Sequence, residues 1–126
     1  MTMKVLDERR AEVVGALCDL IVPGSARVGP AVYIDALLAR MPEADRGQAL
    51  AAVDVLEGSV AGGADALAEH QFTPAFALLR ALACEAFYSD FVAPGAAGPG
   101  GWNEIDFKPP LAARLDKDWS YLGVTE

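Results

Sequence analysis

The side chains that most often do chemistry in proteins are scarce in this chain. His70 is the single histidine, so a two-histidine metal site and a His-Glu-x-x-His helix are excluded by counting. It lies at an expected helix end, where an imidazole commonly meets free carbonyl groups. Cys18 and Cys84 lack the short spacing of a redox or zinc pair. The sequence therefore predicts no catalytic and no metal-binding residue.

Both cysteines lie inside apolar helical patterns, where a thiol usually behaves as a small buried hydrophobe. A disulfide between them requires that their two helices pack together. The glycine-rich run at residues 95–101 lacks the preceding strand and the closing lysine of a phosphate-binding loop. The chain also lacks the glycine fingerprint of a dinucleotide-binding fold. We therefore expect no flavin or nicotinamide cofactor bound by this chain alone.

Charge and composition narrow the class of partner. The chain has 126 residues, with 18 acidic and 10 basic side chains and a formal net charge of −8, so nucleic acid and anionic lipid are poor partners. Apolar residues make up 53%, which favours one folded domain over residues 1–126. Four charged residues at 7–10 stand where a secretory signal needs an apolar run, and no apolar stretch approaches membrane-spanning length. These features predict a soluble, cytoplasmic protein without membrane insertion.

The elements that must position any functional side chain are helices. Hydrophobic periodicity predicts amphipathic helices over residues 7–22, 30–41, 42–62 and 74–89, with a further helical turn over 64–69. Pro23-Gly24-Ser25 ends the first helix, and Thr73-Pro74 supplies an N-cap and a favourable first residue for the last. No internal repeat or strand-like alternation is present. The expected fold is all-α, a small irregular bundle of about four helices.

The last of these helices and the residues after it carry the largest apolar side chains. Residues 74–89 are apolar over much of the helix circumference, so this helix is either the bundle centre or is covered by another protein. Residues 94–101 read as a glycine- and proline-rich irregular loop. Beyond it we expect an extended C-terminal tail that wraps the helices, a partner, or both, because it carries these large side chains: Trp102, Ile105, Phe107, Leu111, Leu115, Trp119, Tyr121 and Leu122.

Two short motifs in this region resemble those of a known protein family. Phe87-Tyr88-Ser89-Asp90 ends the expected fourth helix, and Gly101-Trp102 follows the glycine-rich loop. Together with Leu20-Ile21-Val22-Pro23 upstream, they make the chain resemble the gluconate 2-dehydrogenase subunit 3 family. The chain departs from the family pattern at Ala86, Phe91 and Asp106, where the family usually has glycine, proline and glycine.

The resemblance implies a role as a small accessory subunit. Members of that family are similar in pairing with a large flavoprotein of the glucose-methanol-choline oxidoreductase type, which carries FAD and oxidises an alcohol or sugar. The resemblance thus implies a non-catalytic subunit that binds and stabilises such a partner. Many members carry a twin-arginine export signal. Its absence here leaves either a cytoplasmic member or a trimmed chain exported as a complex.

The residues expected to bind the partner are large or polar groups in and after these motifs. Aromatic side chains at a helix end and after a glycine loop are typical interface anchors, but they also close the core of a small subunit. Asp90 either contacts a partner or caps a loop. Both interpretations apply to the candidate residues Phe87, Tyr88, Asp90, Trp102, Phe107 and Trp119.

Two other functions compete with the accessory-subunit interpretation. The chain is alternatively a stand-alone helical interaction or chaperone-like protein without a stable enzyme partner, which would be soluble and monomeric on its own. An independent enzyme is the weaker alternative, because the usual catalytic residue types are single or unpaired.

Overall fold

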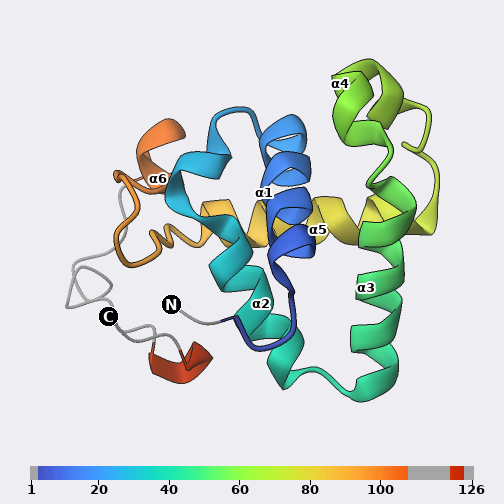
Figure 1. Cartoon of the computed structure of the whole chain (residues 1–126). Coiled ribbons are helices and arrows are strands. Elements are labelled where there is room, and N and C mark those ends of the chain that lie inside the picture. The colour runs from blue at the N-terminus through green and yellow to red at the C-terminus, as the bar shows by residue number, and fades with distance from the viewer. Residues whose placement is uncertain (1–2, 108–119, 124–126) are drawn as a thin grey trace.

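The computed structural model describes residues 3–107 and 120–123 of the chain. Those residues form helices joined by turns and loops, and they contain no strand, so the expected all-α class is confirmed (Figure 1). The expectation of about four helices is roughly met. Four longer helices correspond to the predicted ones, α4 overlaps the helical turn predicted at 64–69, and α6 is additional.

Helix α1 (Glu8–Ile21) begins at an aspartate cap. The carboxylate of Asp7 accepts a hydrogen bond from the backbone N–H of Arg10 at 2.7 Å, which satisfies one of the donors left free at a helix start. The helix stops before Pro23-Gly24, and Gly24 takes a φ of 85° that favours glycine. A single 3₁₀ turn, η1 (Ser25–Val28), then leads to the next helix.

Helix α2 (Pro30–Arg40) starts with proline in its first turn, after Gly29 at a φ of 70°. Its C-terminal carbonyl groups are held by an arginine from the following helix. The guanidinium of Arg46 donates to the backbone oxygens of Leu38, Ala39 and Met41 at 2.9, 3.3 and 3.0 Å. A cation at this end also complements the helix dipole, so Arg46 fixes the turn between the two helices.

The expected single helix over residues 42–62 is wrong in its extent. The structure divides it into α3 (Glu43–Leu56) and α4 (Ser59–Ala68), which also absorbs the helical turn expected at 64–69. Gly63 has a φ of 73°, so α4 is kinked at this residue. The glycine pair that was expected to end a helix therefore lies inside one, and the chain turns earlier, at Glu57 and Gly58.

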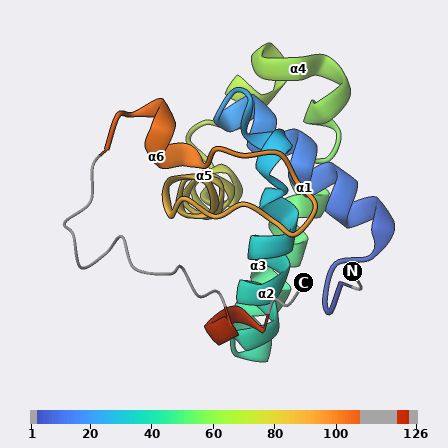
Figure 2. The same cartoon turned by 90° about the vertical axis from the view of Figure 1, so that its left-hand side faces the viewer.

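Helix α5 (Pro74–Tyr88) runs across the other long helices. The hydroxyl of Thr73 accepts the backbone N–H of Phe76 at 3.2 Å, the cap that the sequence predicted. Figure 1 shows α5 running crosswise behind the other long helices, and Figure 2 shows it end-on, to one side of α1, α2 and α3. Its buried residues lie on one face: Leu79, Leu82, Ala83, Ala86 and Phe87. Helix α5 therefore packs one face against the other helices and leaves the opposite face exposed.

Residues 91–100 contain no helix, and the first residues of the expected tail form one helical turn, α6 (Gly101–Glu104). A last 3₁₀ turn, η3 (Ser120–Leu122), packs near α2. Leu122 of this turn is buried in the main core. The described part of the chain has no helix long and apolar enough to cross a bilayer.

The buried carboxylate of Asp35 holds the first described residues against α2. Its two oxygens accept the backbone N–H groups of Lys4, Val5 and Leu6, each at 2.8 Å, although only 4% of the residue is exposed. Hydrogen bonds to a charged group are stronger than neutral ones, and these three satisfy the carboxylate inside the protein. Asp35 therefore fixes the N-terminal segment beside α1 and α2.

Candidate partner interface

Most of the sequence-predicted partner residues come together at the C-terminal end of α5. We call this region the aromatic corner and define it by Phe87, Tyr88, Asp90, Trp102 and Phe107. The corner joins the last turn of α5 to α6, two elements that are in contact. Trp119, the sixth predicted residue, lies outside the described residues. The structure thus unites two motifs that the glycine-rich loop separates in the sequence.

Asp90 acts as a local cap within the corner. Its φ of 67° is a left-handed conformation that aspartate tolerates better than most residues. One carboxylate oxygen accepts the backbone N–H of Trp102 at 3.2 Å, in the first turn of α6. A Cβ on Gly100 would lie 2.3 Å from the same oxygen, so only glycine fits there. This geometry supports the capping interpretation of Asp90.

Two further contacts close the corner from inside. A Cβ on Gly101 would lie 2.2 Å from the backbone oxygen of Phe87, so α6 packs directly against the backbone of α5. The indole Nε1–H of Trp102 donates to the backbone oxygen of Tyr88 at 2.7 Å. The polar atom that often anchors a tryptophan at an interface is therefore already used within the chain.

Arg27 of η1 contacts both helices of the aromatic corner. The guanidinium carbon of Arg27 lies 5.5 Å from the ring centre of Phe87, within the range of a cation–π interaction. The same guanidinium pairs with Glu104 of α6 at 3.3 Å. Arg27 therefore links η1, α5 and α6, and it stabilises the position of α6.

The aromatic rings of the corner differ in exposure. Phe87 is 1% exposed and belongs to the core, whereas Tyr88 and Phe107 are 39% and 46% exposed. Phe107 packs edge-to-face on the half-buried Trp102 with ring centres 5.0 Å apart. The geometry thus supports core closure for Phe87, and Tyr88 and Phe107 are the exposed aromatic residues of the corner.

A second candidate surface was missed by the sequence reasoning. Phe72 lies between α4 and α5 and is 92% exposed, more than any other large apolar side chain that the structure describes as exposed. It borders a groove of about 410 Å³ at the C-terminal end of α1. We call this the Phe72 groove; its apolar lining includes Leu20, Ile21, Leu67 and Phe76.

A local signal could have found Phe72. The segment His70-Gln71-Phe72-Thr73-Pro74 is a polar helix-to-helix connection with one aromatic ring in its middle. A helical search passes over such a residue because it belongs to no apolar stripe. An isolated aromatic in a short connection either turns into the core or stands in solvent. In this structure it stands in solvent.

The two cysteines and His70 are the remaining residues whose side chain types often do chemistry. Cys18 is completely buried. Its burial, and to a smaller extent the nearby Asp19 and Cys84, raises the pKa of its thiol to about 12. Cys84 is half-buried, and both thiols are free although α1 and α5 pack together. The backbone oxygen of His70 accepts the hydroxyl of Thr73. The described residues contain no group of three histidine, cysteine, aspartate or glutamate side chains placed to hold a metal ion.

The comparisons with known proteins add no relative. No protein-family model matches the chain, and neither the curated proteins nor the solved structures give a significant match.

Proposed function

We propose that the chain is a non-catalytic subunit that binds and stabilises a larger FAD-dependent alcohol or sugar dehydrogenase. The observation that carries the binding role is the nearly complete exposure of Phe72 beside an apolar groove. An exposed aromatic ring beside an apolar groove is the kind of side chain that anchors protein interfaces. Resemblance to the gluconate 2-dehydrogenase subunit 3 family supports the choice of a flavoprotein partner.

The interface that we propose has a principal and a secondary part. Phe72 enters a pocket of the large subunit, and an apolar side chain of that subunit enters the Phe72 groove. Tyr88 and Phe107 extend the contact at the other end of α5, where their exposed rings need no rearrangement to meet a partner. FAD and the catalytic residues belong to the large subunit, and the small subunit contributes binding free energy that stabilises the folded partner.

The test is affinity purification of the chain from cells that also express its neighbouring genes. We expect a large partner in stoichiometric amount, found by mass spectrometry, and the visible absorbance of an oxidised flavin in the eluate. Phe72→Ala should lower the recovered flavoprotein at least about tenfold, the usual effect of removing an interface anchor. Val55→Ala is the matched control, because Val55 is an exposed apolar residue of α3 that does not line the groove.

A colourless, monomeric chain with no stoichiometric partner would overturn the proposal. The stand-alone interaction protein would then be the better interpretation. Equal recovery with Phe72→Ala and with unchanged chain would keep the subunit role and remove the Phe72 groove from the interface.

A further inference from the structure

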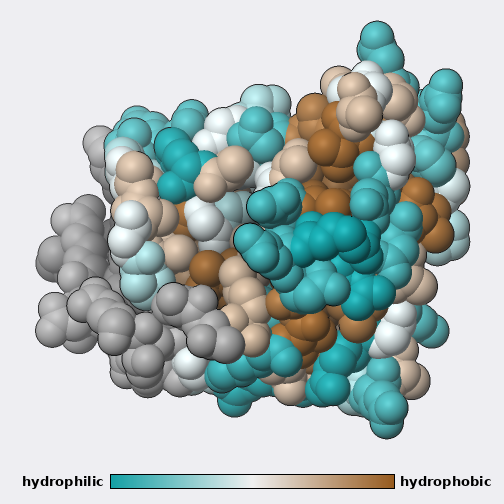
Figure 3. Space-filling model, in the orientation of Figure 1, coloured by the Kyte–Doolittle hydropathy of each residue, from teal (hydrophilic) through white to brown (hydrophobic). Residues whose placement is uncertain are grey.

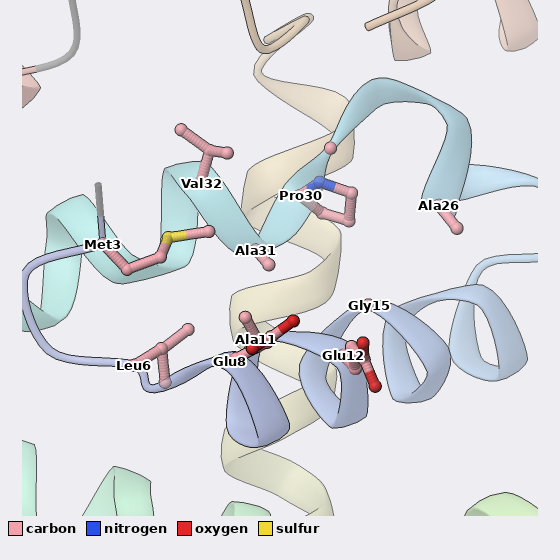
Figure 4. A pocket seen from close by; sticks show the side chains of 11 residues that line it. Met3, Leu6, Glu8, Ala11, Glu12, Gly15, Ala26, Pro30, Ala31 and Val32 are labelled. Carbon is pink, nitrogen blue, oxygen red and sulfur yellow. The ribbon is translucent and has the colours of Figure 1, made fainter. Parts of the chain in front are cut away.

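A second groove lies on another side of α1 and has a different chemistry. It has a volume of about 640 Å³ and lies between α1 and α2, with the N-terminal segment along one end (Figure 4). We call it the acidic groove. Figure 4 shows Pro30, Ala31 and Val32 on its α2 side, with Ala11 and Gly15 on its α1 side. These small residues leave room for another backbone to approach closely.

The charged residues of the acidic groove are two glutamates. Glu8 and Glu12 are exposed, one helical turn apart on α1, and they are the only charged side chains that line it. Within residues 3–107 and 120–123, neither has a hydrogen-bond or ion-pair partner for its carboxylate. The groove is therefore an apolar trough with uncompensated negative charge on one rim.

The arginines near the groove are paired with other acids. Arg9 and Arg10 of α1 form ion pairs with Asp54 of α3, and Arg9 also pairs with Glu57. Figure 3 shows hydrophilic residues gathered over α1 and α3, with apolar surface above and below them. Arg27 pairs with Glu104. The two arginines nearest in sequence to Glu8 and Glu12 are thus held on the α3 side of α1, away from α2.

We propose that the acidic groove docks a basic amphipathic helix of a partner protein. Its large apolar side chains fill the trough, and two lysines or arginines one helical turn apart pair with Glu8 and Glu12. Side chains at i and i+4 lie about 5–6 Å apart on any α-helix, so two helices side by side match such charges in register. Helix-in-groove recognition by apolar anchors is a recurrent binding mode. The proposed occupant is therefore positively charged where the rim of the groove is negatively charged.

This docking site is independent of the proposed flavoprotein partner, and so is its test. The probe is a fluorescein-labelled synthetic helix of about 15 residues, with leucines along one face and lysines one turn apart beside them. A counter-probe has glutamate in place of each lysine. Fluorescence anisotropy is measured as the full chain is added at low salt, because screening weakens exposed charge pairs.

We expect the lysine probe to bind and the glutamate probe to bind at least about tenfold more weakly. Glu8→Gln combined with Glu12→Gln should weaken the lysine probe about tenfold, the combined effect of two exposed pairs. Glu43→Gln combined with Asp45→Asn is the matched control, because it also removes two exposed charges and Asp45 does not line the groove. Glu43 is also an exposed first-turn acid, but it belongs to α3 and does not line the groove.

A steric variant tests the apolar part of the site. A Cβ on Gly15 meets no atom within 4 Å and Gly15 lines the groove, so the side chain of Gly15→Leu starts from open space there, and the change also improves the helix propensity of α1. It should abolish probe binding while the thermal stability is kept. Gly47→Leu is the control, because Gly47 lies in α3 with the same open space and is not in the groove.

Three results would overturn the proposal. The first is absence of binding. The second is equal weakening by the control with Glu43→Gln and Asp45→Asn, which would mean attraction by net charge. The third is self-association of the chain that Gly15→Leu abolishes, since the occupant would then be a second copy. If the large flavoprotein is recovered while the probe fails, the subunit role stands and the helix-docking site does not.

Discussion

The two ends of α5 carry the same kind of side chain in opposite conditions. At its C-terminal end, Phe87 is buried, and Trp102 is tied by its indole nitrogen to the backbone of Tyr88. At its N-terminal end, Phe72 is almost fully exposed beside an unfilled groove. An aromatic residue near a helix end therefore indicates a binding surface only when its ring and polar atoms make few contacts within the chain.

The largest expected effect comes from truncating one phenylalanine at each end. Phe87→Ala should lower the free energy of unfolding by about 3–5 kcal/mol, since it leaves a cavity in the core. Phe72→Ala should change it by less than about 0.5 kcal/mol, since its ring packs against almost nothing in the chain. Urea unfolding of both variants checks this. A similar loss of unfolding free energy in both variants would mean that Phe72, like Phe87, is held by contacts within the chain.

A smaller effect is expected from the glycine that lets α6 meet α5. Gly101→Ala should cost about 1–3 kcal/mol, because the new methyl group would overlap the backbone oxygen of Phe87. Gly47→Ala, in the middle of α3 with open space around it, should instead stabilise the chain by about 0.5–1 kcal/mol. Thermal unfolding of the pair measures both signs. A harmless Gly101→Ala would show that α6 is loosely attached.

The smallest expected effect is a dependence on alkaline pH. Burial, followed by the charge of Glu85, raises the pKa of Tyr33 to about 12, and its ring packs edge-to-face on Phe91 next to the corner. The folded state therefore favours the neutral phenol. This contribution is fully present below the unfolded pKa of about 10 and is lost as pH rises towards 12.

Urea midpoints at pH 8 and pH 11 test this in unchanged chain and in Tyr33→Phe. The substituted chain should lose less stability between the two pH values. An identical loss in both would mean that Tyr33 ionises as freely in the folded state as in the unfolded one.

The sequence predicted the helix ends that depend only on neighbouring residues. Pro23-Gly24 ends α1 and Thr73 caps α5 because a breaker and a cap act on their own neighbours. The boundary between α3 and α4 was misplaced, since no proline marks Glu57 and Gly58 and the helical periodicity continues through them. No local rule in the sequence brings the two corner motifs together or places α6 on the backbone of Phe87.

The candidate surfaces were harder to predict, because exposure depends on how the helices pack. Phe87 and Tyr88 are adjacent, yet one is buried and the other is exposed. Which of them faces inward depends on where α1 and α2 cross α5. The acidic groove depends on three segments that are separate in the sequence, and its two glutamates resemble ordinary solvent-facing acids near the start of a helix. Only the assembled fold shows the trough beside them.

The carboxylate of Asp35 has a consequence for the order in which the chain folds. It accepts hydrogen bonds from the backbone of Lys4, Val5 and Leu6 across a span of about thirty residues, so the segment that precedes α1 acquires its partner only when α2 has been synthesised. Closing such a span costs chain entropy that three charge-assisted hydrogen bonds offset. A truncated chain that starts after Leu6 would leave a buried anion without these donors, and it would also lose one wall of the acidic groove.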